Sequence, residues 1–325
     1  MRIHLKSIAF TCCLASLLLV SLGAAHAQPY PSKPVTVVVP FPPGGSSDVI
    51  ARLINAKLSE AFKQTFLTDN RPGAGTLIGT TYVAKAPADG YTLLLADVPF
   101  TVNPTVLSSA SYDPVRDFTA VTMVGASAQF LYSNPARMSS LAELLKTAKA
   151  KPGGVTIATA GNGTTTHLMT EMLQASAGIK VLQVPYKGSA PALSDAAAGH
   201  VDAVFSTLAS AAPLVKAGKL RVIAVTSKAR LPEFPDVPTF AEAGVQDLVV
   251  EHWWGVLGPA RMPREIVNRL QAEIAKAVSA PDVQERLRTL SVEPRTATPE
   301  EFRDVIDSYT KRWSRIVREN NIKVD

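Results

Sequence analysis

One segment near the start of the chain says more about its architecture than any other: Val35-Thr-Val-Val-Val-Pro-Phe-Pro-Pro-Gly-Gly-Ser-Ser-Asp48. The five β-branched residues at its beginning predict a buried strand, the Pro/Gly run predicts a turn, and the residues that follow predict a helix. Gly44 and Gly45 would let the backbone approach a ligand closely, and Ser46 or Ser47 can cap the helix. Free N–H groups and the positive end of the helix dipole would then face an anion, although an ordinary strand-to-helix turn uses the same residues.

A second segment, Val155-Thr-Ile-Ala-Thr-Ala-Gly-Asn-Gly-Thr-Thr-Thr-His167, repeats the order of strand, glycine turn and helix start later in the chain. Its Thr164, Thr165 and Thr166 supply hydroxyls that can donate to a carboxylate or hold a water, or can cap the helix. Two such turns on opposing lobes would grip an anionic ligand from both sides.

Short β-branched runs alternate with longer amphipathic stretches, which predicts an α/β fold of mostly parallel sheets flanked by helices. Strands are expected at 35–39, 92–95, 155–158, 201–205 and 221–225, and helices at 47–62, 141–149, 165–175 and 190–198. Three further helices, at 263–279, 281–290 and 299–317, begin at or near proline.

The middle of the chain, residues 127–252, is predicted to be a second lobe inserted between the two parts of a first lobe, 28–126 and 253–325. The chain must then cross between the lobes twice, and the apolar segments 121–132 and 248–257 suit these crossings. Two crossings make a hinge with a cleft beneath it, a geometry suited to closing on a ligand.

Residues 1–27 have the pattern of a secretory signal peptide: a basic start, an apolar run at 8–22, and the small-x-small site Ala25-His26-Ala27. The alternative is a transmembrane anchor, for which the run is short. We therefore expect export to the periplasm with cleavage after Ala27. Cys12 and Cys13, the two cysteines of the chain, would leave with the leader, so no disulfide, thiol nucleophile or thiolate metal site is expected.

The charge of the chain is mild. The formal net charge is +6, and removing the two basic residues of the leader lowers it to +4. Basic residues are scattered, so neither a nucleic-acid-binding nor a membrane-binding patch is expected. We expect a monomer without a cofactor or metal.

Two further segments carry candidate ligand-binding side chains. In Val184-Pro-Tyr-Lys-Gly-Ser189, a strand ends at Tyr186 and Lys187, and the lysine would either neutralise an acid or remain a solvated charge. Asp202 opens an apolar strand that ends at Ser206. Its carboxylate would either bind an amine or hydroxyl of the ligand, or satisfy neighbouring backbone amides.

The chain resembles the receptors of tripartite tricarboxylate transporters, known as Bug proteins, in six ordered blocks that extend over most of its length. The blocks are Pro40-Phe-Pro-Pro-Gly-Gly-Ser-Ser-Asp48, Asn70-Arg-Pro-Gly-Ala-Gly75, Ala88-Asp-Gly-Tyr-Thr-Leu-Leu94, Gly161-Asn-Gly-Thr-Thr-Thr-His167, Pro185-Tyr-Lys-Gly-Ser-Ala-Pro191 and Gly199-His-Val-Asp202. Six blocks in the family's order are far more specific than any single glycine turn.

The resemblance implies a periplasmic solute receptor with a type II-like, two-lobed fold that delivers its ligand to membrane permease subunits. It also implies that loops matching 41–48 and 161–167 hold a carboxylate through backbone amides and ordered water. With the candidates above, the expected ligand-binding residues are Phe41, Pro43, Gly44, Gly45, Ser46, Asp48, Thr101, Gly161, Gly163, Thr164, Thr165, His167, Tyr186, Lys187, Asp202 and Ser206.

The sequence departs from the family pattern at two places. Pro42-Pro43 stands where small residues are common, and Asp97-Val-Pro-Phe-Thr101 replaces a more polar stretch. If this second segment lines the cleft, Asp97 and Phe100 change the preference of the pocket. An acidic residue there would favour a ligand that also carries an amine, or would point away from the ligand.

Enzymatic functions are the main alternative. No nucleophile elbow, phosphate-binding loop or His-Glu-x-x-His zinc helix is present in the sequence. His167 and Glu171 share a helix face, but two ligands are too few for a metal. A hydrolase or isomerase would use Asp48, Asp202 and His167 as acid and base in the cleft. A ligand-sensing partner of a signalling protein is the third interpretation.

Overall fold

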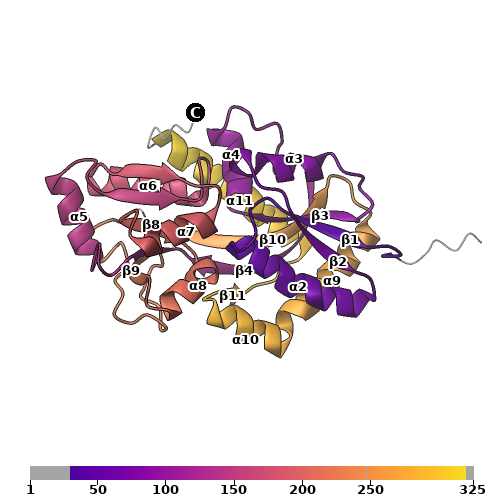
Figure 1. Cartoon of the computed structure of the whole chain (residues 1–325). Helices are drawn as coiled ribbons and strands as arrows, with labels where there is room; N and C mark the ends of the chain where they lie inside the picture. The colour runs from indigo at the N-terminus through magenta and orange to yellow at the C-terminus, as the bar shows by residue number, and fades with distance from the viewer. Residues whose placement is uncertain (1–29, 247, 320–325) are drawn as a thin grey trace, which may run out of the picture. The chain divides into compact units, whose positions relative to one another are not determined.

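The computed structural model describes residues 30–246 and 248–319 of the chain (Figure 1). The predicted leader at 1–27 lies outside the described residues. All elements below belong to one compact unit that begins at Lys33. Across the described ranges, no helix combines the length and the apolar composition that a membrane crossing requires.

The first sheet has six strands in the order β11-β4-β10-β3-β1-β2. Its strands are β1 (Val35–Val39), β2 (Phe66–Asn70), β3 (Thr92–Asp97), β4 (Phe118–Ala128), β10 (Glu251–Pro259) and β11 (Glu293–Pro294). The second sheet has five strands in the order β7-β6-β8-β5-β9. These are β5 (Phe130–Ser133), β6 (Thr156–Thr159), β7 (Leu182–Pro185), β8 (Ala203–Ser206) and β9 (Arg221–Val225).

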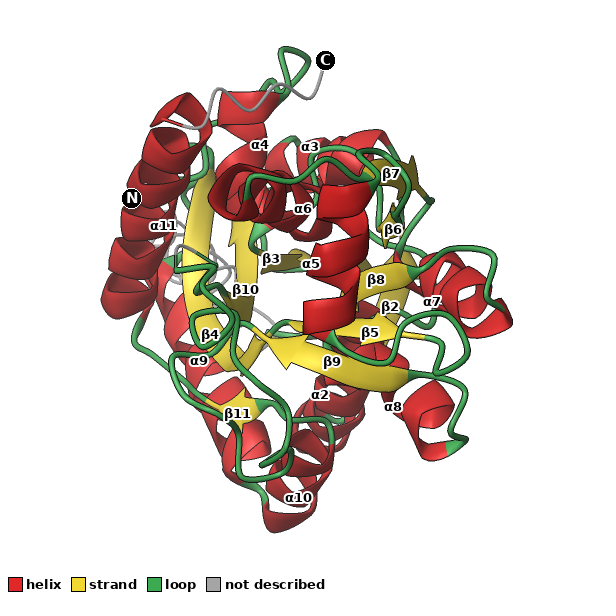
Figure 2. Cartoon of the chain, turned by 90° about the vertical axis from the view of Figure 1, so that its left-hand side faces the viewer, coloured by secondary structure: helices red, strands yellow, loops and turns green. Residues whose placement is uncertain are grey.

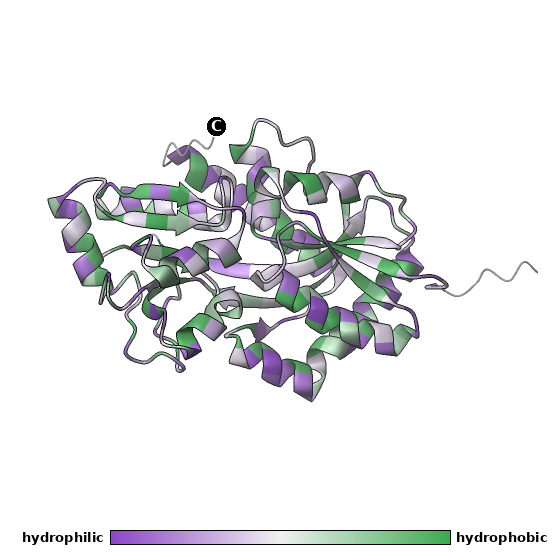
Figure 3. Cartoon of the chain, in the orientation of Figure 1, coloured by the Kyte–Doolittle hydropathy of each residue, from purple (hydrophilic) through white to green (hydrophobic). Residues whose placement is uncertain are grey.

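Helices flank both sheets, as the alternating pattern predicts. Those preceding or following the strands of the first sheet are α2 (Ser46–Phe62), α3 (Leu77–Ala84), α4 (Pro99–Val106), α9 (Arg264–Ser279), α10 (Pro281–Thr289) and α11 (Pro299–Glu319), with the 3-10 turn η1 (Ala74–Thr76). Those of the second sheet are α5 (Leu141–Ala150), α6 (Thr165–Ala177), α7 (Ser189–Ala198) and α8 (Leu208–Lys216). Polar and apolar residues share single helices such as α2, the pattern of a helix with one buried face (Figure 3).

Both sheets are mixed, which differs from the expectation of mostly parallel sheets. β1 pairs in parallel with β2 and β3, and β6 pairs in parallel with β7 and β8. The strands near the crossings run the other way: β10 is antiparallel to β3 and β4, and β5 is antiparallel to β8 and β9. In the first sheet the reason is the inserted lobe, because the chain leaves this sheet through β4 and returns through β10 in the opposite direction (Figure 2).

The two crossings lie in the predicted segments. The chain passes from the first sheet to the second between Ala128 and Phe130, and it re-enters the first sheet at Glu251. The predicted lobe limits, 28–126 plus 253–325 for the first lobe and 127–252 for the second, stay a prediction. The strands β4 and β10 of the first sheet each extend two residues past these limits.

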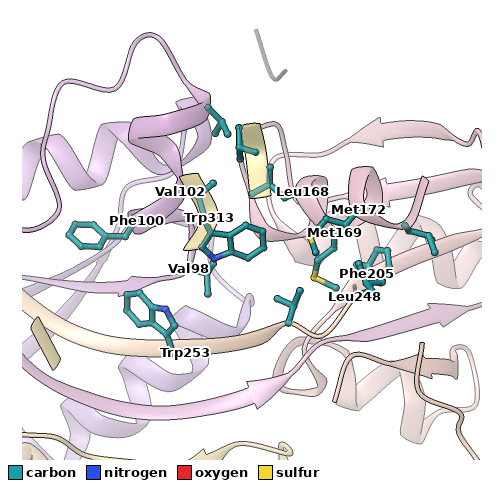
Figure 4. Packing of buried hydrophobic residues seen from close by; sticks show 14 of the residues in the cluster. Val98, Phe100, Val102, Leu168, Met169, Met172, Phe205, Leu248, Trp253 and Trp313 are labelled. Atoms are coloured by element: carbon teal, nitrogen blue, oxygen red, sulfur yellow. The ribbon is translucent and has the colours of Figure 1, made fainter. Parts of the chain in front are cut away.

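One apolar core runs from the first sheet into the second. Trp253 on β10 and Trp313 on α11 belong to the same buried cluster as Leu168 on α6 and Phe205 on β8 (Figure 4). The ring of Trp253 meets that of Phe302 edge-on at 5.5 Å between centroids. The C-terminal helices therefore return to cover β4 and β10, the strands that carry the crossings.

The contact between Phe302 of α11 and Gly255 of β10 allows the packing of this core to be tested. A Cβ at Gly255 would overlap the fully buried ring of Phe302. We expect Gly255→Ala to lower the free energy of unfolding by about 1–3 kcal/mol, because overpacking forces strain on a dense core. Chemical denaturation measures the effect. In a double-mutant cycle with Phe302→Leu, the two changes should be less than additive, and strict additivity would contradict this packing.

Candidate functional site

The two glycine turns lie on one cavity, which we call the inner cavity. The first glycine turn, residues 40–45 between β1 and α2, contributes Phe41, Pro42 and Gly45 to its wall. The second, residues 160–164 between β6 and α6, contributes Ala160 and Thr164. The space between the walls is about 490 Å³ when the open mouth is included. The two turns therefore converge on a shared space.

Four helices begin at this cavity: α2, α6, α7 and α8. Their N-cap residues are Gly45, Thr164, Gly188 and Thr207, and none of these makes a side-chain capping hydrogen bond. The first N–H groups of a helix have no partner within it, and the helix dipole makes this end positive. Several uncapped helix starts around one cavity form a site for an anion.

Asp48 holds the first glycine turn in shape. Its Oδ2 accepts a hydrogen bond of 3.0 Å from the N–H of Gly44, which has a φ of +84° that favours glycine. Arg52 Nε donates to both carboxylate oxygens. Burial alone would raise the pKa of the Asp48 carboxyl, but these hydrogen bonds and the charge of Arg52 lower it overall. Asp48 is thus occupied by the turn and does not line the inner cavity.

The second glycine turn is held by its own side chains. Thr166 Oγ1 accepts from Ala160 N at 2.8 Å, and Thr164 Oγ1 donates to Gly161 O at 2.6 Å. His167 Nδ1 accepts from Gly163 N at 3.2 Å, and burial lowers the pKa of its imidazole. Two of the three threonines therefore serve the turn.

Polar atoms without partners gather on the inner cavity. Across residues 30–246 and 248–319, five buried side-chain atoms of lining residues have no hydrogen-bond partner. They are Thr165 Oγ1, Ser206 Oγ, Thr207 Oγ1, Gln129 Oε1 and His252 Nε2. Buried polar groups are nearly always satisfied in folded proteins, so this wall is built for polar groups that come from outside the chain.

Asp97 lies in the inner cavity wall and Phe100 does not. Ser47 Oγ donates to Asp97 Oδ2 at 2.9 Å, and Trp254 Nε1 donates to Ser47 Oγ at 3.2 Å. The ring of Phe100 instead stacks on Tyr112 at 5.6 Å, inside the apolar core. Of the two residues in this segment that were expected to alter the pocket, only Asp97 lines the inner cavity.

A wider outer cavity lies next to the inner one and shares Phe41, Pro42, Ala160 and Thr164 with it. Tyr186 and Lys187 line this outer cavity. Tyr186 donates its hydroxyl to Asp195 at 2.6 Å, and burial together with that carboxylate raises its pKa to about 12.

Asp202 is built into the second sheet. Its Oδ2 accepts from the N–H and the hydroxyl of Thr156, each at 2.8 Å, and its Oδ1 accepts from Arg137. Burial alone would raise the pKa of Asp202, but these hydrogen bonds and the charge of Arg137 lower it overall. Asp202 lines neither cavity, and the contacts support its interpretation as a partner of backbone amides.

The predicted ligand-binding residues fall into three groups: those that line the inner cavity, those that line the outer cavity, and those that line neither. The inner cavity is lined by Phe41, Gly45, Ser46, Thr164, Thr165 and Ser206. The outer cavity is lined by Phe41, Gly161, Thr164, Tyr186 and Lys187. Neither cavity is lined by Pro43, Gly44, Asp48, Thr101, Gly163, His167 or Asp202.

Several lining residues were not among the predicted ligand-binding residues, above all Gln129 and His252. The sequence explains His252, which adjoins two tryptophans, by packing at the crossing. Both are polar residues within mostly apolar crossing segments, which is a signal that could have marked them. Gln129 Nε2 and His252 Nδ1 lie 3.0 Å apart. In the described part of the chain, no cluster of three or more His, Cys, Asp or Glu side chains could hold a metal ion.

Known proteins match most of the chain. The family model described as "Tripartite tricarboxylate transporter family receptor" matches residues 50–322. The solved structure of the periplasmic binding protein BugD has 30% sequence identity and a TM-score of 0.87, and the match covers 90% of this chain and 99% of BugD.

Two solved structures of similar proteins contain ligands. R. palustris Rpa4515 with adipate has 35% identity and a TM-score of 0.87, and the match covers 90% of this chain and 99% of that one. MatC from Rhodopseudomonas palustris with bound malate has 29% identity and a TM-score of 0.84, covering 89% of this chain and 100% of that one. Both ligands are small dicarboxylates.

The contacts of Asp202 generate a prediction on stability. We expect Asp202→Ala to lower the free energy of unfolding by about 2 kcal/mol near pH 7, because the partly buried N–H of Thr156 loses its acceptor. Since the pKa of Asp202 is lowered by folding, its stabilisation is present above the unfolded pKa. It is lost as the pH falls through the folded pKa, so the difference from wild type should shrink below about pH 4.

Denaturation at several pH values measures this effect. The exposed Asp236, for which no ion pair or side-chain hydrogen bond is found among the described residues, provides the matched control. Asp236→Ala should change stability by less than about 0.5 kcal/mol. Equal effects of the two substitutions would contradict the structural role of Asp202.

Proposed function

Because the chain belongs to the family of tripartite tricarboxylate transporter receptors, we propose that it captures a small carboxylate in the inner cavity and presents it to the permease subunits of such a transporter. The protein acts as an exported, periplasmic monomer and not as an enzyme. The signal-peptide pattern of residues 1–27 supports the location.

The convergence of uncapped helix starts on one cavity carries this proposal. The carboxylate lies between the first turns of α2 and α6, where backbone N–H groups from both lobes donate to its oxygens. The unpartnered hydroxyls of Thr165, Ser206 and Thr207 complete its shell, directly or through water. The adipate and malate in similar proteins support a carboxylate as the ligand class.

Contacts across the mouth support a two-lobed capture mechanism. A Cβ at Gly188 would lie 2.8 Å from Cδ of Pro42, and a Cβ at Gly163 would lie 3.1 Å from Cδ1 of Leu107. These glycines let the rims of the two lobes meet. A ligand that bridges the two glycine turns stabilises this arrangement over an open one through its differential contacts, and the permease recognises the closed surface.

An acid–base enzyme is the second candidate function. The positions of the three side chains that it would need do not support it. It needs Asp48, Asp202 and His167 in one cleft. Each of these side chains is instead held by neighbouring groups, and none lines the inner cavity.

A ligand screen tests the proposal. We expect small carboxylates to raise the melting temperature of the mature protein, because a ligand that binds only the folded state stabilises it. Calorimetry then gives the affinity, and product analysis after long incubation checks for turnover. Failure of every mono-, di- and tricarboxylate and amino acid to stabilise the protein would contradict the proposal, as would conversion of a bound acid.

Substitutions of two glycines separate ligand approach from backbone strain. Gly45 has a φ of −77°, and a Cβ added there would have Pro42 O as its nearest neighbour, at an ordinary contact distance of 3.7 Å. We expect Gly45→Val to fold normally but to bind the ligand at least ~10-fold more weakly, since the branched side chain enters the inner cavity. Gly163 has a φ of +74°, so Gly163→Val should weaken binding and also lower stability.

Calorimetry and thermal melts measure both variants. Ala150→Val, on the exposed end of α5, is the control for adding a branched side chain and should leave affinity unchanged. Wild-type affinity in both glycine variants would overturn the placement of the carboxylate.

A further inference from the structure

The inner cavity has a second pole that differs chemically from the helix starts. At this pole lies Asp97, whose side chain is 4% exposed. Its Oδ2 accepts from Ser47, and the remaining oxygen Oδ1 receives no hydrogen bond from any other described side chain. Among the described residues, no lysine or arginine lines the inner cavity. A buried carboxylate without a cationic partner is costly.

His252 on β10 faces Asp97 across this pole. Gln129 Nε2 lies 3.0 Å from His252 Nδ1, so the amide donates and the imidazole accepts. With Nδ1 as the acceptor, the ring proton lies on Nε2. His252 Nε2 stands 3.5 Å from Asp97 Oδ2, beyond hydrogen-bond geometry, and has no hydrogen-bond partner among the described residues. Apart from this contact, no described cationic side chain pairs with the carboxylate of Asp97.

Gln129 adds a second free acceptor at the same pole. With its amide nitrogen turned to His252, its buried Oε1 has no partner in the described part of the chain. The inner cavity therefore has N–H donors on the side of the glycine turns and two unused acceptors, Asp97 and Gln129 Oε1, at the other pole. Acceptors of this kind are satisfied by an ammonium group, which has three donors and a positive charge.

We propose that the ligand is a zwitterion, a small carboxylic acid that also carries an ammonium group, with the ammonium held by Asp97 and Gln129. This inference rests on the proposed function, because the carboxylate end is placed by the glycine turns. Asp97 is the residue that sets specificity: a second carboxylate at this pole would meet a like charge in a poorly solvated site, so dicarboxylates are rejected.

Matched ligand sets test this assignment on the mature wild-type protein by calorimetry. Each set keeps one carbon skeleton and changes one end: hexanoate, 6-aminohexanoate and adipate; and butanoate, 4-aminobutanoate and succinate. In at least one set, the amino member should bind at least ~10-fold more tightly than both its unsubstituted and its dicarboxylate partner.

Asp97→Asn should remove this preference while keeping the shape of the wall. We expect the affinity for the amino member to fall at least ~10-fold. The affinity for the dicarboxylate should rise relative to that for the amino member. Asp97→Ser is the second variant should the amide disturb the contact with Ser47. Ser206→Ala is the matched control within the cavity, which should weaken all members of a set without changing their ratio, and Asp236→Asn is the surface control.

The outcomes separate the two proposals. If the wild type binds carboxylates but prefers the dicarboxylate, or if Asp97→Asn leaves the ratio unchanged, the zwitterion assignment is overturned and the carboxylate receptor stands. If no carboxylate or amino acid binds, both fall. The wild-type ratios decide the assignment even if neither Asp97 variant folds.

Discussion

The first N–H groups of a helix have no carbonyl partner inside that helix. In this protein, four helices begin at the same cavity. The starts of α2, α6, α7 and α8 lie on the inner cavity, and none has a side-chain cap. Donors of this kind are costly when they are buried without an acceptor. The N–H groups at these helix starts therefore need an acceptor from an anion or from water in the cavity. The binding function follows from this need.

The polar residues around the glycine turns divide into those that build the turns and those that stay free. Asp48 and His167 each accept an N–H from a glycine of their own turn, and Thr166 accepts one from Ala160. Thr165 and Ser206 keep their hydroxyls without partners among the described residues. This division explains why residues that are adjacent in the sequence have different functions, since a group that holds the turn cannot also bind the ligand.

The strands that join the lobes also form part of the cavity wall. Gln129 lies between β4 and β5, and His252 lies on β10, so the wall at the acceptor pole is made by both crossings. Trp253, next to His252, packs into the apolar core against Phe302. A ligand that contacts this pole would therefore touch both segments that join the lobes.

The sequence by itself determined the local elements and the two glycine turns. The run of β-branched residues at 35–39 and the Pro/Gly turn before α2 are local signals, and β1 (Val35–Val39) and α2 (Ser46–Phe62) form where they predict. The resemblance to the receptor family is confirmed by the family model, which matches residues 50–322. These features could be predicted because they depend on neighbouring residues in the chain.

Only the tertiary structure decided the direction of the strands and the second pole of the cavity. The antiparallel strand β10 makes the first sheet mixed, and β5 does the same in the second sheet. The register of β10 with β3 places Trp254 opposite Asp97. Side chains two residues apart in a strand share a face, so His252 joins them, while Phe100 turns into the core from α4. The residues of this pole come from distant parts of the chain, and strand pairing, which no local pattern records, brings them together.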